Sequence, residues 1–242
     1  MVLVILGCLM AGVLQAQELV QSARVRAVIA QQSDIKAAYY AFYDRYKALP
    51  GDYAAASANI NCGATACLDG DGDGSIDPGP GSSGNGNHYG NNGGNNGNHY
   101  GNLDEGLLAW THLSAAGFLS GRFTMASHAL TTPDDSNSPK NPYGAYLQIL
   151  FDSSWGYSTN PVLRPNLKTG NLIPVAVLAE IDRKVDDGRP GSGHFQFSTY
   201  AGVATAPDAG GTDSQSCTTQ DDQTATWNEV GGQTNCGAAS LL

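Results

Sequence analysis

The feature that most constrains this chain is a long segment without helix breakers near its N-terminus. From Glu18 to Leu49 the sequence contains neither proline nor glycine, and Pro50-Gly51 follows directly. Apolar side chains recur in this segment at intervals of three, four or seven residues, which is the spacing of one helical face. They are Val25, Val28, Ile35, Tyr39, Phe42, Tyr46 and Leu49. The pattern predicts one helix over residues 1–49, about 70 Å long at 1.5 Å per residue.

The beginning of this helix differs from the rest because it is apolar on every side. Residues 1–17 carry no charge, and the apolar run from Val2 to Leu14 is shorter than the roughly 20 residues of a full bilayer span. A secretory or lipoprotein signal would need a basic start, which is absent before Glu18. Since the run continues into the amphipathic part, we expect a membrane helix whose beginning precedes residue 1.

A helix that is apolar all round must be buried in lipid or among other helices. The residues expected to form this assembly surface are Val2, Leu3, Val4, Ile5, Leu6, Leu9, Val13 and Leu14. The chain therefore divides into a hydrophobic part over 1–17, an amphipathic part over 18–49, and a head over 50–242.

Charge is distributed unevenly between these parts. The chain has 12 Lys and Arg against 22 Asp and Glu, for a formal net charge of -10. Arg24, Arg26 and Lys36 are among the basic groups of the helix, whereas the head is strongly acidic. This balance argues against a nucleic-acid partner, which would require a basic patch. The 31 glycines and the 14% of charged residues are typical of a loop-rich secreted or surface protein.

The cysteines form two close pairs in the sequence. Cys62 precedes Cys67 by five residues, and Cys217 precedes Cys236 by nineteen, while Cys8 lies alone in the apolar segment. The pairs favour two local disulfides formed in an oxidising compartment. Zinc is the competing interpretation, but neither pair is CxxC and no histidine has ligand spacing to them.

An acidic loop follows the first cysteine pair. DGDGDGSID at 69–77 resembles the start of an EF-hand loop, with glycine at the sixth position and Pro80 in place of glutamate at the twelfth. The predicted calcium ligands are Asp69, Asp71, Asp73, Asp77 and the carbonyl of Ser75. The missing twelfth ligand would come from Asp104 or Glu105. The alternative is a solvated acidic turn, and a bound Ca²⁺ would be structural.

The segment over 79–102 is of low complexity. It contains nine glycines and eight asparagines, and GNHYGN occurs twice. Such a composition predicts an exposed loop without a core. The simplest interpretation is a variable insertion. The alternative is a contact surface for neighbours, sugars or metal, formed by His88, Tyr89, His99 and Tyr100. GPGSSG at 79–84 follows no strand and is rejected as a nucleotide site.

The rest of the head mixes helix and strand patterns, which indicates an α+β fold. We expect a helix from Leu103 to Gly117 with Asn102 as its cap, and another from Pro174 to about Asp187. Buried strands are expected over 145–151 and 194–204. His112 has no evident catalytic partner. Asp182, Asp186 and Asp187 favour a turn or a metal-stabilising role over catalysis.

The N-terminal helix with ALPGD resembles that of type IV pilins and type II secretion pseudopilins. LDEGLLAWTHLSAAGFLSG, IDRKVDDGRPGSG and the C-terminal cysteine pair resemble the same group. The resemblance implies a long helix packed on a small antiparallel sheet, with extended loops and a C-terminal region bounded by a disulfide at 217–236. The basic leader and the glutamate of the family's mature helix have no counterpart here.

The resemblance implies a structural subunit, a major pilin, of an extracellular type IV pilus-like filament (fimbrium) on a bacterial surface. Its partners would be further copies of itself, the inner membrane before assembly, and the pilus assembly machinery. The basic groups of the helix would pair with acidic residues of neighbouring subunits. The alternatives are a type II secretion pseudopilin and a minor pilin or adhesin at the filament tip. The sequence lacks the common catalytic motifs, so we expect no enzyme.

Overall fold

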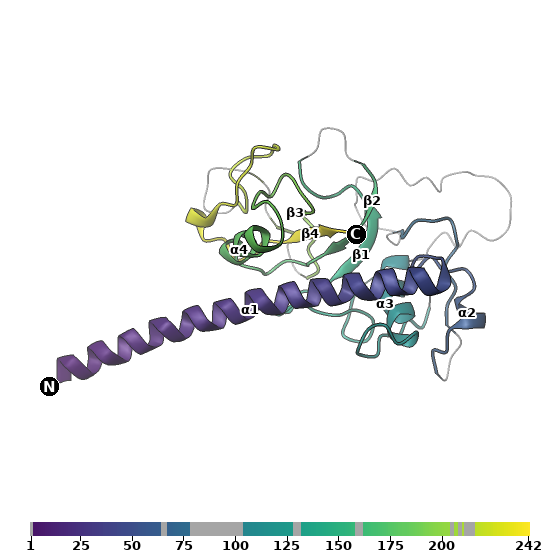
Figure 1. Cartoon of the computed structure of the whole chain (residues 1–242), viewed down its shortest axis with the longest axis horizontal. Coiled ribbons are helices and arrows are strands. Elements are labelled where there is room, and N and C mark those ends of the chain that lie inside the picture. The colour runs from purple at the N-terminus through teal and green to yellow at the C-terminus, as the bar shows by residue number, and fades with distance from the viewer. Residues whose placement is uncertain are drawn as a thin grey trace.

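The computed structural model has a long N-terminal helix packed along a head that contains a small antiparallel sheet (Figure 1). It describes residues 2–63, 67–77, 104–127, 132–157, 162–203, 206–207, 210 and 216–242, with side chains described from residue 19 onward. The expected α+β class and the expected long helix on a small antiparallel sheet are confirmed over these residues.

The sheet has four strands in the order β1-β2-β4-β3, and every neighbouring pair is antiparallel. The strands are β1 (Gln148–Asp152), β2 (Arg164–Lys168), β3 (Phe195–Phe197) and β4 (Ala238–Leu241). Leu150 of β1 pairs with Asn166 of β2, and Phe197 of β3 pairs with Ala238 of β4. The C-terminal strand is therefore central in the head, and it joins two strands that are distant in the sequence.

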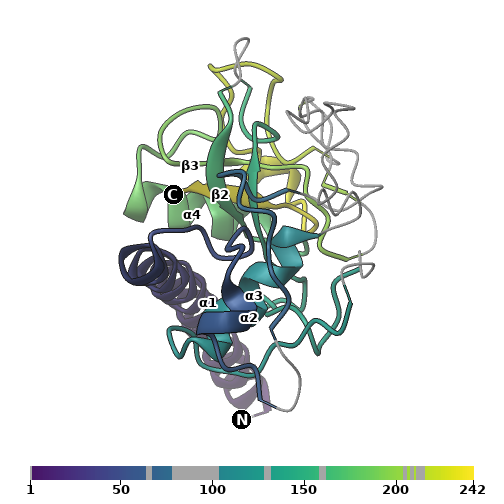
Figure 2. The same ribbon diagram turned by 90° about the vertical axis from the view of Figure 1, so that its right-hand side faces the viewer.

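The helices are α1 (Val2–Tyr46), α2 (Ala56–Asn59), α3 (Glu105–Ala115) and α4 (Val175–Val185), with a 3-10 turn η1 (Glu229–Gly231). Figure 2 looks nearly along α1 and shows α3 and α4 beside it. Both contact α1, and they also contact the sheet through β1 and β3 respectively. The two shorter helices therefore link the long helix to the sheet.

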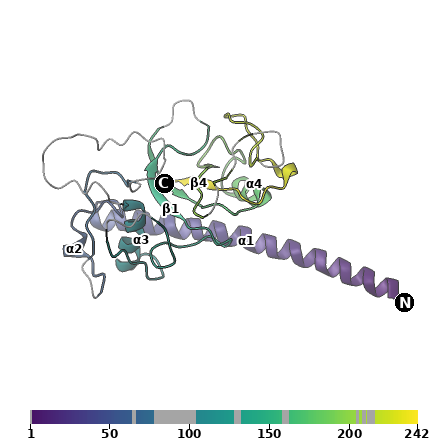
Figure 3. The ribbon, with the colours of Figure 1, turned by 180° about the vertical axis from the view of Figure 1, so that it is seen from behind.

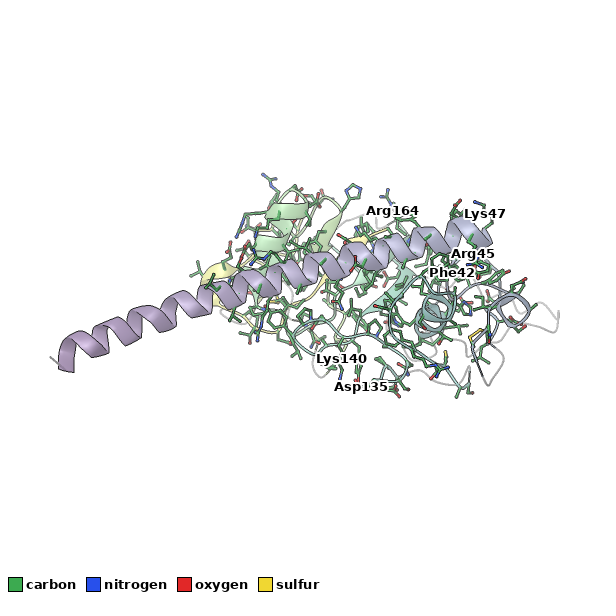
Figure 4. The ribbon with its side chains drawn as sticks, turned by 60° about the horizontal axis from the view of Figure 1, so that its bottom comes forward. Phe42, Arg45, Lys47, Asp135, Lys140 and Arg164 are labelled. Atoms are coloured by element: carbon green, nitrogen blue, oxygen red, sulfur yellow. A yellow bond between two sulfur atoms is a disulfide. The ribbon has the colours of Figure 1, made fainter. Side chains whose placement is uncertain are left out.

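The buried side of α1 follows the predicted stripe and divides into two clusters. Val25 and Val28 pack with α4, β3 and the Cys217–Cys236 disulfide. Further along, Ile35, Tyr39 and Phe42 pack with α3, β1 and β2. Figure 4 marks Phe42 on α1 beside the head, with Arg45 and Lys47 toward the end of the helix.

α1 ends earlier than the sequence predicted. The last helical residue is Tyr46, and Lys47 adopts a left-handed φ of 54° while its N–H still donates to the carbonyl of Tyr43 at 2.8 Å. A left-handed residue with this hydrogen bond is a common helix terminus. The helix therefore ends three residues before Leu49, ahead of the Pro50-Gly51 turn that was expected to end it.

The other predicted elements occur with changed limits. Asp104 caps α3, because its Oδ1 accepts a 2.9 Å hydrogen bond from the N–H of Leu107, whereas Asn102 lies outside the described residues. α4 begins after Pro174 as expected and ends at Val185. The strand expected over 145–151 is β1, and only three residues of the pattern at 194–204 form β3.

Within the residues described, no helix is both long enough and apolar enough to cross a membrane.

Candidate functional site

The candidate site lies where the chain turns back after α1 and meets the start of α3. The backbone is so closely packed there that a Cβ on Gly51 would lie 2.3 Å from the carbonyl oxygen of Glu105. A Cβ on Gly70 would lie 2.2 Å from the carbonyl oxygen of Gly51. Since only glycine permits such approaches, these residues bring Asp52, the acidic loop and the N-terminus of α3 together.

Three carboxylates converge at this point. Asp52, Asp71 and Asp73 each offer one oxygen, and these three atoms lie within 4.8 Å of one another. Asp52 is only 4% exposed, whereas Asp73 is exposed to solvent. The cluster is thus a concentrated negative site with one buried wall and one open side.

Asp52 has one occupied and one unoccupied oxygen. Its Oδ2 accepts a hydrogen bond from the N–H of Gly74 at 3.2 Å. Its Oδ1 is buried and has no hydrogen-bond partner among the residues that the structure describes. Burial raises the pKa of Asp52 to about 7, and the nearby charges of Asp73 and Asp71 contribute in the same direction.

The buried side chain of Glu105 holds the acidic loop through its backbone. Its Oε1 accepts from the N–H of Asp71 at 3.0 Å, and its Oε2 accepts from the N–H of Asp77 at 3.2 Å. The residue is 1% exposed, and this burial raises the pKa of Glu105 to about 8. Glu105 therefore fixes both ends of the acidic turn through backbone hydrogen bonds.

The five predicted calcium ligands have different partners in the structure. Both carboxylate oxygens of Asp69 are hydrogen-bonded to Ser57, one to its N–H at 2.7 Å and one to its hydroxyl at 2.9 Å. The Ser75 hydroxyl donates to Asp73 and to Asp77 at 2.7 and 3.0 Å. Asp71 and Asp73 lie beside Asp52, a residue that the spacing of an EF-hand loop does not identify as a ligand. The calcium prediction itself stays a prediction.

The two candidates for the twelfth ligand have different roles. Asp104 caps α3, while Glu105 binds the backbone of the loop. A sequence signal for Asp52 did exist, since it directly follows the Pro50-Gly51 turn. Its partners, however, lie nineteen and twenty-one residues further along the chain, and only the fold brings them together.

A second group of acidic residues, at the end of α4, holds the turn that follows this helix. Asp182 is fully buried, and its two oxygens accept from the indole N–H of Trp227 at 2.7 Å and from the N–H of Gly188 at 3.2 Å. Asp186 accepts from the N–H groups of His194 and Phe195, and Asp187 accepts from the Ser192 hydroxyl at 2.6 Å. These hydrogen bonds stabilise a turn, which is one of the two roles that the sequence favoured. One oxygen from each of the three carboxylates also lies within 4.8 Å of the others, so the metal-stabilising role stays a prediction.

The other predicted residues fall into three groups. Both disulfides, Cys62–Cys67 and Cys217–Cys236, are present with Cα–Cα distances of 5.2 and 5.7 Å. The residues of the predicted assembly surface belong to α1, but their side chains lie outside the described residues. The low-complexity segment with His88, Tyr89, His99 and Tyr100 also lies outside them.

The described part of α1 carries an exposed face opposite the head. Leu19 and Val20 are 70% and 54% exposed, and Tyr40 and Tyr43 are about half exposed. Between them the exposed face carries small side chains at helical spacing; these are Ala23, Ala27, Ala30 and Ala37.

Two basic residues of α1, Arg24 and Lys36, have neighbours in their own head. The Arg24 guanidinium lies 5.0 Å from the centre of the Tyr143 ring. Lys36 is partly buried, and this burial lowers its pKa although Asp186 acts against the shift. Arg26 is exposed.

Comparison of the chain with protein-family models, with curated proteins and with solved structures found no match. Function is therefore inferred from the residues of this chain.

Proposed function

We propose that this chain is a structural subunit of an extracellular type IV pilus-like filament, and that it assembles through α1. The observation that carries the proposal is the extension of α1 beyond the head (Figures 1 and 3). Leu19 and Val20 are exposed where side chains are first described, and the preceding residues 2–14 are apolar or small. A helix of this kind needs burial against lipid or against other helices.

The exposed face of α1 suits helix packing in a filament. Alanines at 23, 27, 30 and 37 allow close approach of a second helix, as small residues do where helices pack tightly. Tyr40 and Tyr43 add large apolar contact areas with polar tips.

Charge favours association of the helix with other heads. Residues 1–49 carry five basic and three acidic groups, whereas residues 50–242 carry seven basic and nineteen acidic groups. Opposite net charges on two parts of one subunit favour contact between the helix of one copy and the head of the next. Arg26, which is exposed on α1, is the basic residue best placed for such a contact. In this proposal the inner membrane holds the subunit before the assembly machinery incorporates it.

Helical cryo-electron microscopy of filaments sheared from the producing cells tests the proposal. The repeating density should fit α1 in the core and the acidic head on the outside. Filaments made of another protein would contradict it and would favour a minor tip subunit or a pseudopilin.

A matched pair of variants tests the role of α1. Ala30→Arg places a bulky charge on the exposed face of α1 and should abolish filaments while leaving the subunit folded. Val230→Arg, at a fully exposed position of the η1 turn in the head, is the control and should leave filament yield unchanged. Normal filament yield in the Ala30→Arg variant would exclude this face of α1 from the packing.

A further inference from the structure

We propose that Asp52, Asp71 and Asp73 bind one Ca²⁺ ion at the junction between α1 and α3. This site is independent of the proposed filament function. It also differs from an EF-hand loop, because its buried ligand precedes the loop in sequence and Asp69 is excluded from it.

The first argument is the unused oxygen of Asp52. Asp52 is only 4% exposed, yet its Oδ1 has no hydrogen-bond partner among the described residues. A buried polar atom without a partner costs free energy, and such atoms are uncommon in folded proteins. An oxygen of the same carboxylate lies within 4.8 Å of oxygens of Asp71 and Asp73. A cation at this point would satisfy Oδ1.

The second argument is the unbalanced charge. The ion pairs found in the described part of the chain do not include the two buried carboxyl groups of this junction, Asp52 and Glu105. Burying carboxylates without a positive partner is costly, so charge neutralisation by a divalent ion would stabilise this arrangement.

The ligand atoms select the metal. All three proposed side-chain ligands are carboxylates, which suit hard cations, whereas zinc sites usually contain histidine or cysteine. Asp71 and Asp73 come from a glycine-rich loop with an open side, and such flexible sites accept the irregular coordination of Ca²⁺ better than the strict octahedron of Mg²⁺. Carbonyl groups of the loop and water would complete the coordination.

The two disulfides indicate an oxidising compartment outside the cytosol. Calcium sites of extracellular modules have dissociation constants of about 10⁻⁴–10⁻³ M, and we expect a value in this range.

The ion would join three segments that are far apart in the sequence. Asp52 lies after the end of α1, Asp71 and Asp73 lie in the acidic loop, and Glu105 of α3 holds that loop by two backbone hydrogen bonds. Calcium would therefore fix the C-terminal end of α1 against the head.

Calcium titration of the purified full chain, by calorimetry and by thermal unfolding, tests the proposal. We expect one site per chain and an increase of the unfolding temperature by about 4 °C at 10 mM Ca²⁺. Asp52→Asn should weaken calcium binding at least tenfold. Equal binding by wild type and Asp52→Asn, or no calcium binding by the wild type, would overturn the proposal.

Three further variants separate the ion from local turn chemistry. Asp73 and Asp134 have the same local role, since Oδ1 of each accepts from the N–H and the hydroxyl of the serine two residues later. Asp73→Asn should weaken calcium binding at least tenfold, whereas Asp134→Asn should leave it within twofold of the wild type. Asp69→Asn should also retain binding, because both Asp69 oxygens bind Ser57. Loss of binding in Asp69→Asn with retention in Asp52→Asn would favour the EF-hand-like ligand set instead and would overturn the site proposed.

Discussion

His112 accepts a hydrogen bond at Nδ1 from the backbone N–H of Gly51, over 3.0 Å. Because Nδ1 is the acceptor, the proton of the neutral ring lies on Nε2, which donates to the carbonyl of Leu68 at 2.9 Å. The ring is fully buried and is stacked on Phe42, with ring centres 6.0 Å apart. One neutral imidazole therefore joins α1, the turn after it and the segment before the acidic loop.

The first prediction concerns the pH dependence of this contact. Burial lowers the pKa of His112 from 6.5 to about 4, so the unfolded chain binds the proton more readily than the folded chain. The contribution of the neutral ring to stability is therefore complete above pH 6.5 and is lost as the pH falls toward 4. From pH 7.5 to pH 4, the advantage of the wild type over His112→Gln should decrease by about 3 kcal/mol.

Urea unfolding of both proteins at the two pH values measures this difference. Since the other titrating groups are shared, their effects cancel in the comparison. An advantage that stays constant between pH 7.5 and pH 4 would show that His112 does not titrate differently in the folded state.

The second prediction concerns Asp182, whose titration has the opposite sign. Burial raises the pKa of Asp182 to about 6, although the Trp227 hydrogen bond acts against the shift. The folded chain therefore binds this proton more readily than the unfolded chain. The contribution is complete below pH 3.8 and is lost as the pH rises through 6.

The free energy of unfolding of Asp182→Asn, relative to that of the wild type, should therefore increase as the pH rises from 4 to 7.5. Asp182→Ala should lose about 2–3 kcal/mol at pH 4, because the indole of Trp227 and the N–H of Gly188 lose their acceptor. This loss should decrease by about 2 kcal/mol at pH 7.5, because the titration of Asp182 destabilises the wild type there. Chemical unfolding followed by tryptophan fluorescence provides the values. Asp187→Asn, at an exposed neighbouring position, is the control. A flat pH response of the Asp182→Asn difference would contradict the interpretation.

The long helix was predictable because its signals are local. The apolar spacing identified Val25, Val28, Ile35, Tyr39 and Phe42, and all five are buried against the head. The end of α1 was harder to predict from the sequence, because Lys47 carries no signal for a left-handed conformation.

Two strands gave no usable signal. β2 contains Pro165, which usually argues against a paired strand, and it places the charged Lys168 in the interior. β4 is Ala-Ala-Ser-Leu, which lacks the branched and aromatic residues common in strands. Their pairing depends on the tertiary fold. The same holds for Asp52, which meets the acidic loop only because Gly51 and Gly70 allow close backbone contact.

The third prediction concerns the buried ion pair of Lys168 and Asp152. The side chain of Lys168 is 1% exposed. Its ammonium group donates to Oδ1 of Asp152 at 3.0 Å and to the carbonyl of Ser154 at 2.8 Å. Lys168→Met should lower the free energy of unfolding by about 3–5 kcal/mol, because Asp152 would remain buried without its partner.

The exposed pair Lys184–Glu180, with an N–O distance of 2.6 Å, offers a matched control. Lys184→Met should change the free energy of unfolding by less than about 1 kcal/mol, since exposed pairs contribute little. Similar losses in the two lysine variants would mean that burial of Lys168 is energetically unimportant.

The fourth prediction compares the two disulfides. Cys217 and Cys236 close a loop over a sequence separation of 19, whereas Cys62 and Cys67 are separated by five residues. A crosslink stabilises mainly by restricting the unfolded chain, and the effect grows with loop length. Replacing both residues of the longer loop by alanine should cost about 3 kcal/mol, and the same change in the shorter loop about 2 kcal/mol. Cys217 and Cys236 are also fully buried in the cluster that holds Val25 and Val28. Cys67 is buried in the other cluster, with Cys62 half-buried against it, so removing the sulfur atoms adds a packing loss to both loops.

Denaturant unfolding of the two double variants, each under oxidising and reducing conditions, separates these contributions. Reduction of the wild type removes the crosslinks but keeps the sulfur atoms in the core. A larger loss from the shorter loop would show that chain entropy does not control the contribution of these crosslinks.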